Sequence, residues 1–320
     1  MNATLVDIKN NADFVDINRS KAEFDAIYTK DDPRSYFSVL GSLDYMIPDI
    51  AAPITRQLYA AWSEAYGGVP TVLDVGCSYG INAAVHRYAL SFRSLRARYA
   101  RRELMTLEPR EVIELDRHYF RSWPEVGIAR MGGLDASAQA IRYATDVGLL
   151  DWGFVANLET ELPTLAMARR FQGVDIILST GAIGYITART FEHLLIGKRR
   201  PWVISFALRM FPYAAIEATL AAHGLVTEKL QNAVFVQRRF RDSQEFEQCL
   251  ATLAEQGVDT TEFEATGLLQ AELYVSRPEE DVAAHPLDSL VTIVSGRNRA
   301  TGFRYVHVQT DEGAQIGLEM

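Results

Sequence analysis

A short apolar run followed at once by a glycine-bounded loop is the feature that most constrains the fold. Residues 71–75 are β-branched or apolar apart from one aspartate, and a run of this length next to turn residues is typical of a buried strand. Gly76 and Gly80 bound the loop that follows. An apolar stripe at helical spacing then extends from Val85 to Leu95. The sequence therefore predicts a strand, a tight loop and a helix in direct succession.

The same alternation continues along the chain. A helix is expected between Ser137, a suitable N-cap, and Gly148, a suitable C-terminal stop. Strands alternating with helices favour a doubly wound, mainly parallel α/β sheet with helices on both faces. We expect seven strands in a single domain. The further strands are expected at 131–136, 152–156, 174–178, 201–206, 234–236 and 273–275, with later helices at 212–224 and 243–257.

The composition of the glycine loop predicts the kind of ligand it binds. In a doubly wound sheet, ligands bind beyond the carboxyl ends of the strands. A dinucleotide-binding loop would have the pattern G-x-G-x-x-G from Gly76, but Ser78 and Ile81 occupy the second and third glycine positions. Asp74 would repel a pyrophosphate and favour a cationic ligand. The loop therefore suits a cation without phosphate better than a dinucleotide.

Residues 72–80, with the sequence VLDVGCSYG, resemble the first motif of the class I S-adenosylmethionine-dependent methyltransferases. In that family the loop surrounds the methionine part of the cofactor, which carries a sulfonium and an ammonium group. Ser78 stands where the family more often has glycine. The resemblance implies the Rossmann-like class I methyltransferase fold, S-adenosylmethionine as cofactor and S-adenosylhomocysteine as product. The cofactor-binding residues that it implies in this loop are Asp74, Gly76, Cys77, Ser78, Tyr79 and Gly80.

Three later loops are similar to the remaining cofactor-binding positions of the family. There, an acidic residue after the second strand accepts hydrogen bonds from the ribose hydroxyls, the loop after the third strand recognises adenine, and the loop after the fourth faces the acceptor. An acidic residue in the first of these positions could alternatively only cap a helix. The implied residues are Asp135 and Ala136 after the second strand, Asn157 and Leu158 after the third, and Ser179, Thr180 and Gly181 after the fourth.

The chain has additions around the expected methyltransferase domain at 67–284. More residues separate the glycine loop from Asp135 than the roughly 20 that a minimal unit needs, so we expect a helical insertion at about 96–127. Its arginines either receive an anionic substrate or form a solvated helix face. Residues 1–66 are expected to form a helical lid, and residues 285–320 an extension that could form a hairpin from 290–294 and 303–308.

The substrate and catalytic candidates come from the lid, the insertion and the loop after the fourth strand. Arg34 can pair with a carboxylate, and Tyr28 and Tyr36 can donate hydrogen bonds or pack between helices. Methyl transfer is an in-line displacement for which positioning and exclusion of water supply much of the rate, so a base is optional. The candidates for such a base are Tyr185 and His118.

Composition restricts the class of protein further. The chain has 320 residues, of which 48% are hydrophobic and 23% charged, as in a globular protein. No apolar run approaches the ~20 residues of a membrane span and no signal peptide is evident, so we expect a cytoplasmic protein without a membrane partner. The net charge of −9 disfavours nucleic acid as a partner. No metal is expected, because the pair Glu114 and His118 lacks a third ligand.

The sequence as a whole predicts a biosynthetic methyltransferase that modifies an O, N or S atom of a small molecule. Two alternatives remain open: a binding protein that has this fold without transfer activity, and a nucleic-acid methyltransferase that uses the arginines of the insertion. A dinucleotide oxidoreductase is disfavoured by Asp74 and the interrupted glycine pattern. The strands expected after His285 could pair across a homodimer.

Overall fold

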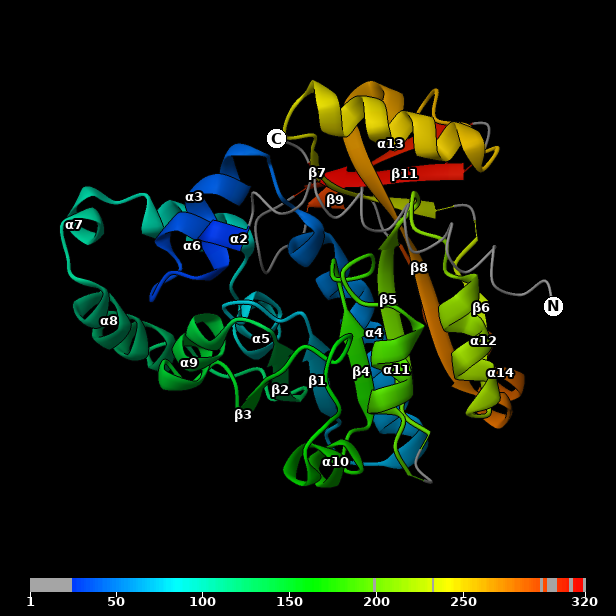
Figure 1. The fold of residues 1–320 in the computed structure, drawn as a ribbon, viewed down its shortest axis with the longest axis horizontal. Helices are drawn as coiled ribbons and strands as arrows, with labels where there is room; N and C mark the ends of the chain where they lie inside the picture. The colour runs from blue at the N-terminus through cyan, green and yellow to red at the C-terminus, as the bar shows by residue number, and fades with distance from the viewer. Residues whose placement is uncertain are drawn as a thin grey trace.

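The computed structural model describes residues 25–197, 200–231, 233–293, 296–297, 304–310 and 313–318, which form one mixed eleven-stranded sheet flanked by helices (Figure 1). The strands are β1 (Thr71–Val75), β2 (Arg130–Asp135), β3 (Trp152–Val155), β4 (Ile176–Ser179), β5 (Trp202–Leu208), β6 (Leu225–Lys229), β7 (Ala233–Arg239), β8 (Leu268–Pro278), β9 (Gly296–Arg297), β10 (Arg304–Thr310) and β11 (Gly313–Leu318).

The helices that precede or follow these strands vary from one turn to more than five turns. They are α2 (Asp25–Tyr28), α3 (Arg34–Ser42), α4 (Ile47–Tyr66), α5 (Ile81–Arg87), α6 (Phe92–Tyr99), α7 (Arg102–Met105), α8 (Pro109–Arg121), α9 (Ala138–Asp146), α10 (Leu165–Phe171), α11 (Ala188–Leu194), α12 (Ala214–Ala222), α13 (Ser243–Glu255), α14 (Glu279–Ala284), α15 (Leu287–Leu290) and the 3₁₀ helix η2 (Glu264–Thr266).

The strand order confirms the predicted fold class. Strands β3, β2, β1, β4 and β5 are neighbours in that order and run parallel. The chain moves to one side of β1 through β2 and β3 and to the other side through β4 and β5, so the strand order reverses between β1 and β4. This is the doubly wound arrangement, whose ligand site lies at the reversal point beyond the carboxyl ends of the strands. Together with β7 and β8, these strands are the seven that the sequence predicts.

Four further strands enlarge the sheet beyond the predicted seven. β6 pairs with β8, and β11 pairs in parallel with β7, with Ala314 opposite Ala233. β10 pairs antiparallel with β11 and with β9. The segment expected to pair with 303–308 behaves differently: Leu290 ends α15, residues 291–293 belong to no strand, and residues 294 and 303 lie outside the described residues. The partners of β10 are therefore β11 and β9, within the same chain.

The predicted helix boundaries follow from local capping chemistry. The Ser137 hydroxyl accepts a hydrogen bond from the Ala140 N–H at 3.1 Å, and Gly148 has the left-handed φ of +80° after the last turn of α9. Pro48 lies in the first turn of α4, where its missing N–H costs no helical hydrogen bond. Such signals act over three or four residues, so they can be identified from the sequence.

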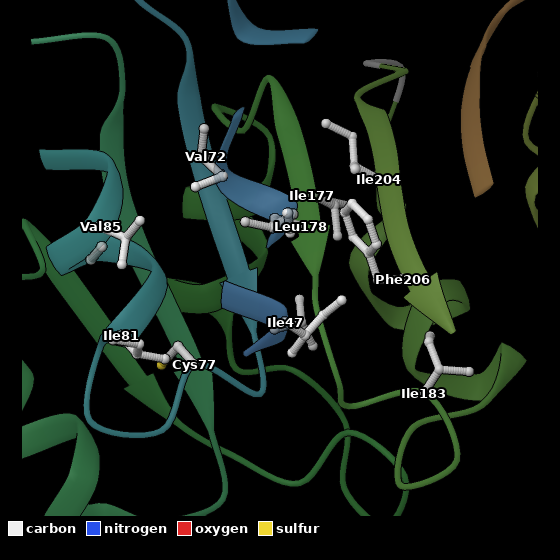
Figure 2. Packing of buried hydrophobic residues seen from close by; sticks show 14 of the residues in the cluster. Ile47, Val72, Cys77, Ile81, Val85, Ile177, Leu178, Ile183, Ile204 and Phe206 are labelled. Carbon is white, nitrogen blue, oxygen red and sulfur yellow. The ribbon is translucent and has the colours of Figure 1, made fainter. Parts of the chain in front are cut away.

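Helices cover both faces of the sheet. Figure 1 shows α11 and α12 in front of the strands and α4 behind them. Ile47 of α4 packs in the same buried cluster as Val72 of β1 and Ile177 of β4 (Figure 2). Each such side chain stabilises the fold by about 1.5–3 kcal/mol when fully buried. The expected lid at 1–66 therefore takes part in the core, since α4 packs against the sheet and α2 and α3 contribute Ile27 and Phe37 to the same buried cluster. Residues 1–24 lie outside the described residues.

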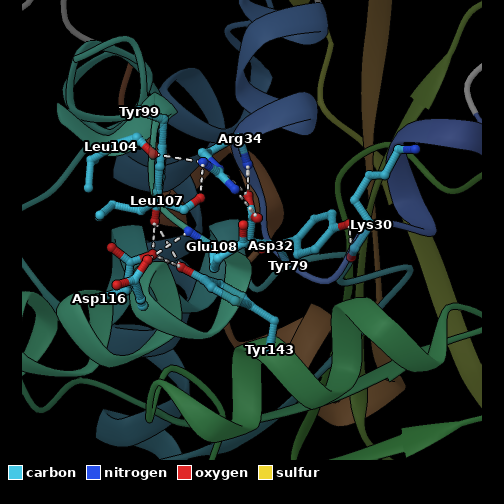
Figure 3. Close-up of polar contacts among 11 residues, drawn as sticks. Lys30, Asp32, Arg34, Tyr79, Tyr99, Leu104, Leu107, Glu108, Asp116 and Tyr143 are labelled. Carbon is cyan, nitrogen blue, oxygen red and sulfur yellow. Dashed lines mark hydrogen bonds and ion pairs between the residues drawn. The ribbon is translucent and has the colours of Figure 1, made fainter. Parts of the chain in front are cut away.

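The insertion folds around one buried carboxylate. Asp116 of α8 accepts hydrogen bonds from Arg98 at 2.7 and 3.1 Å, from the Tyr99 hydroxyl at 2.9 Å and from the Tyr143 hydroxyl at 2.7 Å (Figure 3). Arg98 also lies 3.9 Å from the centre of the Tyr119 ring. Because Tyr143 belongs to α9, which follows β2, this network attaches the insertion to the helices that cover the sheet. Arg98 therefore serves the insertion's own core rather than an anionic substrate.

Candidate cofactor and acceptor site

The loop between β1 and α5 has a backbone conformation that requires its glycines. Gly76 and Gly80 have φ values of +74° and +79°, and Ser78 has the left-handed φ of +48°. A Cβ on Gly76 would lie 2.5 Å from the Cβ of Ala182 in the loop after β4. Gly76 is thus required both by its φ and by the close approach of the two loops.

Asp74 lies at the reversal point of the sheet with its side chain buried. The Asn82 amide donates hydrogen bonds to its two carboxylate oxygens at 3.0 and 3.1 Å and to the Thr180 hydroxyl at 3.0 Å. Burial raises the pKa of Asp74 to about 7, and the hydrogen bonds from Asn82 partly oppose this. Asn82 was not predicted as a site residue, although its place in the first turn after the glycine loop is a usable signal. The Asp74 carboxylate is thus held by a neutral donor and has no cationic side chain as a partner among the described residues.

Asp135 ends β2 and holds the glycine loop. Its two oxygens accept hydrogen bonds from the Ser78 and Ser137 backbone N–H groups, each at 2.8 Å. Burial raises the pKa of Asp135, and these N–H donors act in the opposite direction. The N-cap of α9 is Ser137, so Asp135 is not itself the helix cap. Ala136, also an expected contact, lies between these two residues.

The loop after β3 is tied to the start of α11. Asn157 is exposed, and its side-chain oxygen accepts a hydrogen bond from the Glu159 N–H at 3.1 Å. Glu159 in turn accepts hydrogen bonds from the side-chain hydroxyls of Thr187 at 2.8 Å and Thr190 at 2.5 Å. Leu158 is buried. The accessible group of this loop is therefore the Asn157 amide, while Leu158 contributes apolar packing.

The loop after β4 brings together groups that sequence reasoning did not connect. Ser179 and Thr180 are buried, and the Ser179 hydroxyl has no hydrogen-bond partner among the described residues. A Cβ on Gly181 would lie 3.3 Å from the Gln237 amide nitrogen and 3.5 Å from the Tyr45 hydroxyl oxygen. Gln237 and Tyr45 therefore flank Gly181. Nothing in the local sequence of either residue indicates this position.

Helix α2 and the turn after it lie directly on the loops that follow β1 and β2. The Tyr79 hydroxyl is within hydrogen-bonding distance of the carbonyl oxygens of Ile27, at 2.9 Å, and Lys30, at 2.7 Å (Figure 3). The Ser137 hydroxyl donates to the carbonyl oxygen of Tyr28. Cys77 is buried within the same loop. The first and second strand ends are thus covered by the N-terminal part of the chain.

Two of the expected substrate residues lie in an aromatic cluster beside these loops. The Tyr36 ring centre is 5.9 Å from that of Tyr28 and 5.6 Å from that of Tyr79. Tyr36 is buried, whereas Tyr28 is half-buried. Burial raises the pKa of Tyr36 well above its ordinary value, with a smaller effect of the nearby carboxyl groups. Tyr36 is therefore a neutral hydroxyl at physiological pH.

Arg34 occupies a different environment from the one expected of a substrate-binding residue. Its guanidinium forms a bidentate ion pair with Asp32, at 2.8 Å for each contact, and donates to the carbonyl oxygens of Leu104 at 2.7 Å and Leu107 at 2.9 Å (Figure 3). These contacts attach the start of α3 to the insertion. The Arg34 guanidinium thus binds groups of the protein itself, and a role in substrate binding stays a prediction.

The two candidate bases lie in different surroundings. Tyr185 follows β4 and its side chain is 43% exposed. His118 lies on α8, where its imidazole is 70% exposed and 3.2 Å from Glu114. Figure 1 shows α8 away from β4 and β5. The structure therefore brings Tyr185 to the edge where the strands end, and it does not bring His118 there.

None of the described helices has both the length and the apolar character needed to cross a membrane. Among the described residues, no three His, Cys, Asp or Glu side chains gather as ligands of a metal ion.

The strand order and the glycine loop together define the class I methyltransferase fold. No protein family model and no curated protein matches the sequence. Similar solved structures include the plantazolicin methyltransferase BpumL in complex with a triazolic desmethylPZN analogue and SAH, at 10% identity over 73% of this chain and 85% of that chain, with a TM-score of 0.33. The magnesium protoporphyrin IX methyltransferase from Synechocystis with bound SAM has 14% identity over 70% of this chain and 79% of that one, with a TM-score of 0.30.

Two other solved structures are also similar to this chain. A putative RNA methyltransferase from Pyrococcus horikoshii is similar at 15% identity over 73% of this chain and 84% of that chain, with a TM-score of 0.35. EvdMO1 is similar at 14% identity over 70% of this chain, with a TM-score of 0.31, and this chain spans 40% of its length.

Proposed function

We propose that this chain is an S-adenosylmethionine-dependent methyltransferase that transfers a methyl group to an O, N or S atom of a small molecule. The observation that carries the proposal is the pair of carboxylates, Asp74 and Asp135, at the ends of adjacent strands on either side of the left-handed glycine loop. Buried carboxylates favour a cationic ligand and oppose a phosphate. S-adenosylmethionine carries a positively charged sulfonium group and an ammonium group, and it has no phosphate.

The residues present fit this cofactor. Asp135 has lone pairs beyond those used by its two backbone donors, and such oxygens can accept hydrogen bonds from ribose hydroxyls. The Ser78 and Ser179 hydroxyls are buried and have no partner among the described residues, so each would gain a hydrogen bond from a bound ligand. Asp74 would lie beside the positively charged methionine part. Asn157 is accessible for the adenine.

The chain's own contribution to the reaction is positioning. The cofactor supplies a methyl group already activated by its sulfonium. The glycine loop and Asp135 would orient that group, and the loop from Ser179 to Tyr185 would present the acceptor to it. The contacts of Tyr79 with the carbonyl groups of α2 and its following turn support a role of the N-terminal segment in excluding water. Tyr185 is the candidate base when the acceptor is a hydroxyl.

Calorimetric titration with S-adenosylmethionine and S-adenosylhomocysteine tests the proposal, followed by transfer of a labelled methyl group to a panel of small molecules. We expect saturable binding at one site and labelled product from at least one acceptor. An absence of heat and of thermal stabilisation at millimolar cofactor would contradict the proposal.

Two further outcomes separate the alternative functions. Cofactor binding without transfer to a broad panel would favour a binding protein that has the fold alone. Labelling of RNA in preference to small molecules would favour a nucleic-acid methyltransferase. Cytoplasmic location and pairing as a homodimer stay predictions.

A further inference from the structure

The strand β7 contains an irregularity next to the loop after β4. Val236 pairs with Gln270 and Arg238 pairs with Leu269, so Gln237 is the extra residue of a β-bulge. Bulges bend a strand and redirect a side chain, and they are frequent beside active sites. Here the side-chain amide nitrogen of Gln237 lies 3.3 Å from the position that a Cβ on Gly181 would occupy.

Two backbone hydrogen bonds bring Tyr45 to the same place. The Met46 N–H donates to the Gln237 carbonyl at 2.9 Å, and the Arg239 N–H donates to the Leu43 carbonyl at 2.8 Å. These bonds attach the segment between α3 and α4 to the end of β7. The Tyr45 hydroxyl consequently lies 3.5 Å from the same Cβ position on Gly181. Two polar groups from distant parts of the chain thus flank one glycine.

The Gln237 side chain has hydrogen-bonding capacity that the protein does not use. Gln237 is only 5% exposed, and its amide forms no side-chain hydrogen bond with the described residues. Its amide atoms are not among the fully buried side-chain atoms that lack a partner, so the amide stays accessible to a ligand beside Gly181. An amide in this situation, aimed at the loop proposed to face the acceptor, is suited to a ligand.

The charged groups around this position would be matched once the cofactor is bound. Arg238 is paired with Glu245 at 2.6 and 2.9 Å, and the cationic methionine part of the cofactor would match Asp74. Burial raises the pKa of Tyr45 above its ordinary value, and the nearby Tyr28 raises it by a smaller amount. The Tyr45 hydroxyl is therefore neutral. A charged group placed between Tyr45 and Gln237 would be buried without a new counter-charge, which is unfavourable. An uncharged polar group would satisfy both side chains.

We infer that Gln237 and Tyr45 recognise the acceptor, and that the acceptor carries an uncharged hydroxyl, carbonyl or amide group at this position. The inference rests on the proposed methyltransferase function and specifies the substrate class of the same site. The rings of Tyr36, Tyr45 and Phe92 adjoin one another, with centres 5.3 Å apart for Tyr45 and Phe92 and 6.2 Å apart for Tyr36 and Phe92. Tyr36 and Phe92 are buried, so the half-buried Tyr45 is the ring of this group that a ligand reaches, and it suits an uncharged aromatic compound.

Matched probes test the inference on the full chain saturated with S-adenosylhomocysteine. The probes are 4-hydroxybenzamide and 4-hydroxybenzoate, which differ in charge, and binding is measured by ligand-observed NMR titration. We expect the amide to bind at least tenfold more tightly than the carboxylate. Gln237→Leu should weaken amide binding at least tenfold and Tyr45→Phe at least threefold, both with S-adenosylhomocysteine affinity unchanged within twofold. The control is Gln244→Leu at an exposed position of α13, which should change neither affinity.

The outcomes distinguish this inference from the proposed function. If the wild-type chain binds no S-adenosylhomocysteine, the proposed function fails. If it binds S-adenosylhomocysteine but prefers the carboxylate, binds neither probe, or binds the amide equally well in Gln237→Leu and Tyr45→Phe, only the inference is overturned. Thermal unfolding of each variant identifies any loss of binding that results from misfolding. If Gln237→Leu is misfolded, the amide affinity of Tyr45→Phe, which removes a single oxygen atom, decides whether the inference stands.

Discussion

At the scale of single residues, Asp135 is the most direct test of the cofactor site. Asp135→Asn keeps the shape of the side chain but removes its charge and one acceptor oxygen. We expect affinity for S-adenosylmethionine to fall by about 1.5–3 kcal/mol, the cost of losing a hydrogen bond to a charged group. Calorimetry measures this change, and an unchanged affinity would remove Asp135 from the site.

The pH dependence of cofactor binding should report on Asp74. Burial raises the pKa of Asp74 to about 7 in the folded protein, whereas an aspartate in the unfolded chain has a pKa of about 4. Between these two pH values the folded protein therefore holds a proton that the unfolded chain has lost. Because the folded state binds this proton more tightly, the proton stabilises the folded state at low pH, and this stabilisation is lost as the pH rises towards 7. A cation favours the ionised carboxylate, so affinity should increase from pH 6 to 8 with release of a proton.

Asp74→Asn provides the comparison for this pH prediction. Asp49 also has a pKa raised by burial to about 7. The contribution of Asp74 is therefore measured by the difference in pH dependence between the wild-type chain and Asp74→Asn, not by the wild-type chain alone. We expect calorimetry in buffers of different ionisation enthalpy to show the proton release only in the wild-type chain. Equal proton release in both would contradict the prediction.

Gly76 and Gly148 form a matched pair for separating backbone strain from steric overlap. Both have left-handed φ values, but a Cβ on Gly148 meets nothing within 4 Å, whereas one on Gly76 lies 2.5 Å from Ala182. Gly148→Ala should lower the free energy of unfolding by about 1 kcal/mol. Gly76→Ala should lower it by more and also weaken cofactor binding. Urea denaturation and calorimetry check both, and equal costs would mean that the loops can separate freely.

At the scale of elements, the buried network of the insertion is the clearest target. Asp116→Ala would leave Arg98 largely buried without its counter-charge, and we expect a loss of about 3–5 kcal/mol in the free energy of unfolding. The control is Glu114→Ala on the exposed part of the same helix, for which surface ion pairs predict about 0–1 kcal/mol. Urea denaturation compares the two, and similar costs would contradict a structural role for Asp116.

At the scale of the whole molecule, the N-terminal segment should respond to the cofactor. Hydrogen exchange of amides at 26–37 should slow when S-adenosylhomocysteine binds, because this segment contacts the cofactor loops through Tyr79 and Ser137. Tyr79→Phe removes the hydroxyl that joins the two parts, so the same amides should exchange faster in that variant. Protection that is independent of the cofactor would show that these contacts do not couple the segment to the site.

The sequence by itself determined the features that depend on neighbouring residues. The glycine loop, the strands β1 to β5 and the caps of α9 are local patterns, and an acidic residue near the end of a parallel strand must lie near the carboxyl ends of the sheet. Asp74 and Asp135 could therefore be placed without the tertiary structure. The resemblance of residues 72–80 to a known motif added the identity of the cofactor.

Only the tertiary structure decided which distant side chains meet. The pairing of β11 with β7, the engagement of Arg34 by the insertion and the exposure of His118 on α8 depend on packing between elements far apart in the chain. The meeting of Tyr45, Gly181 and Gln237 depends on a bulge and on two backbone hydrogen bonds. Residue patterns act over one or two turns, whereas these contacts are selected by the packing of the whole sheet, so the acceptor side of the site could not be predicted from the sequence.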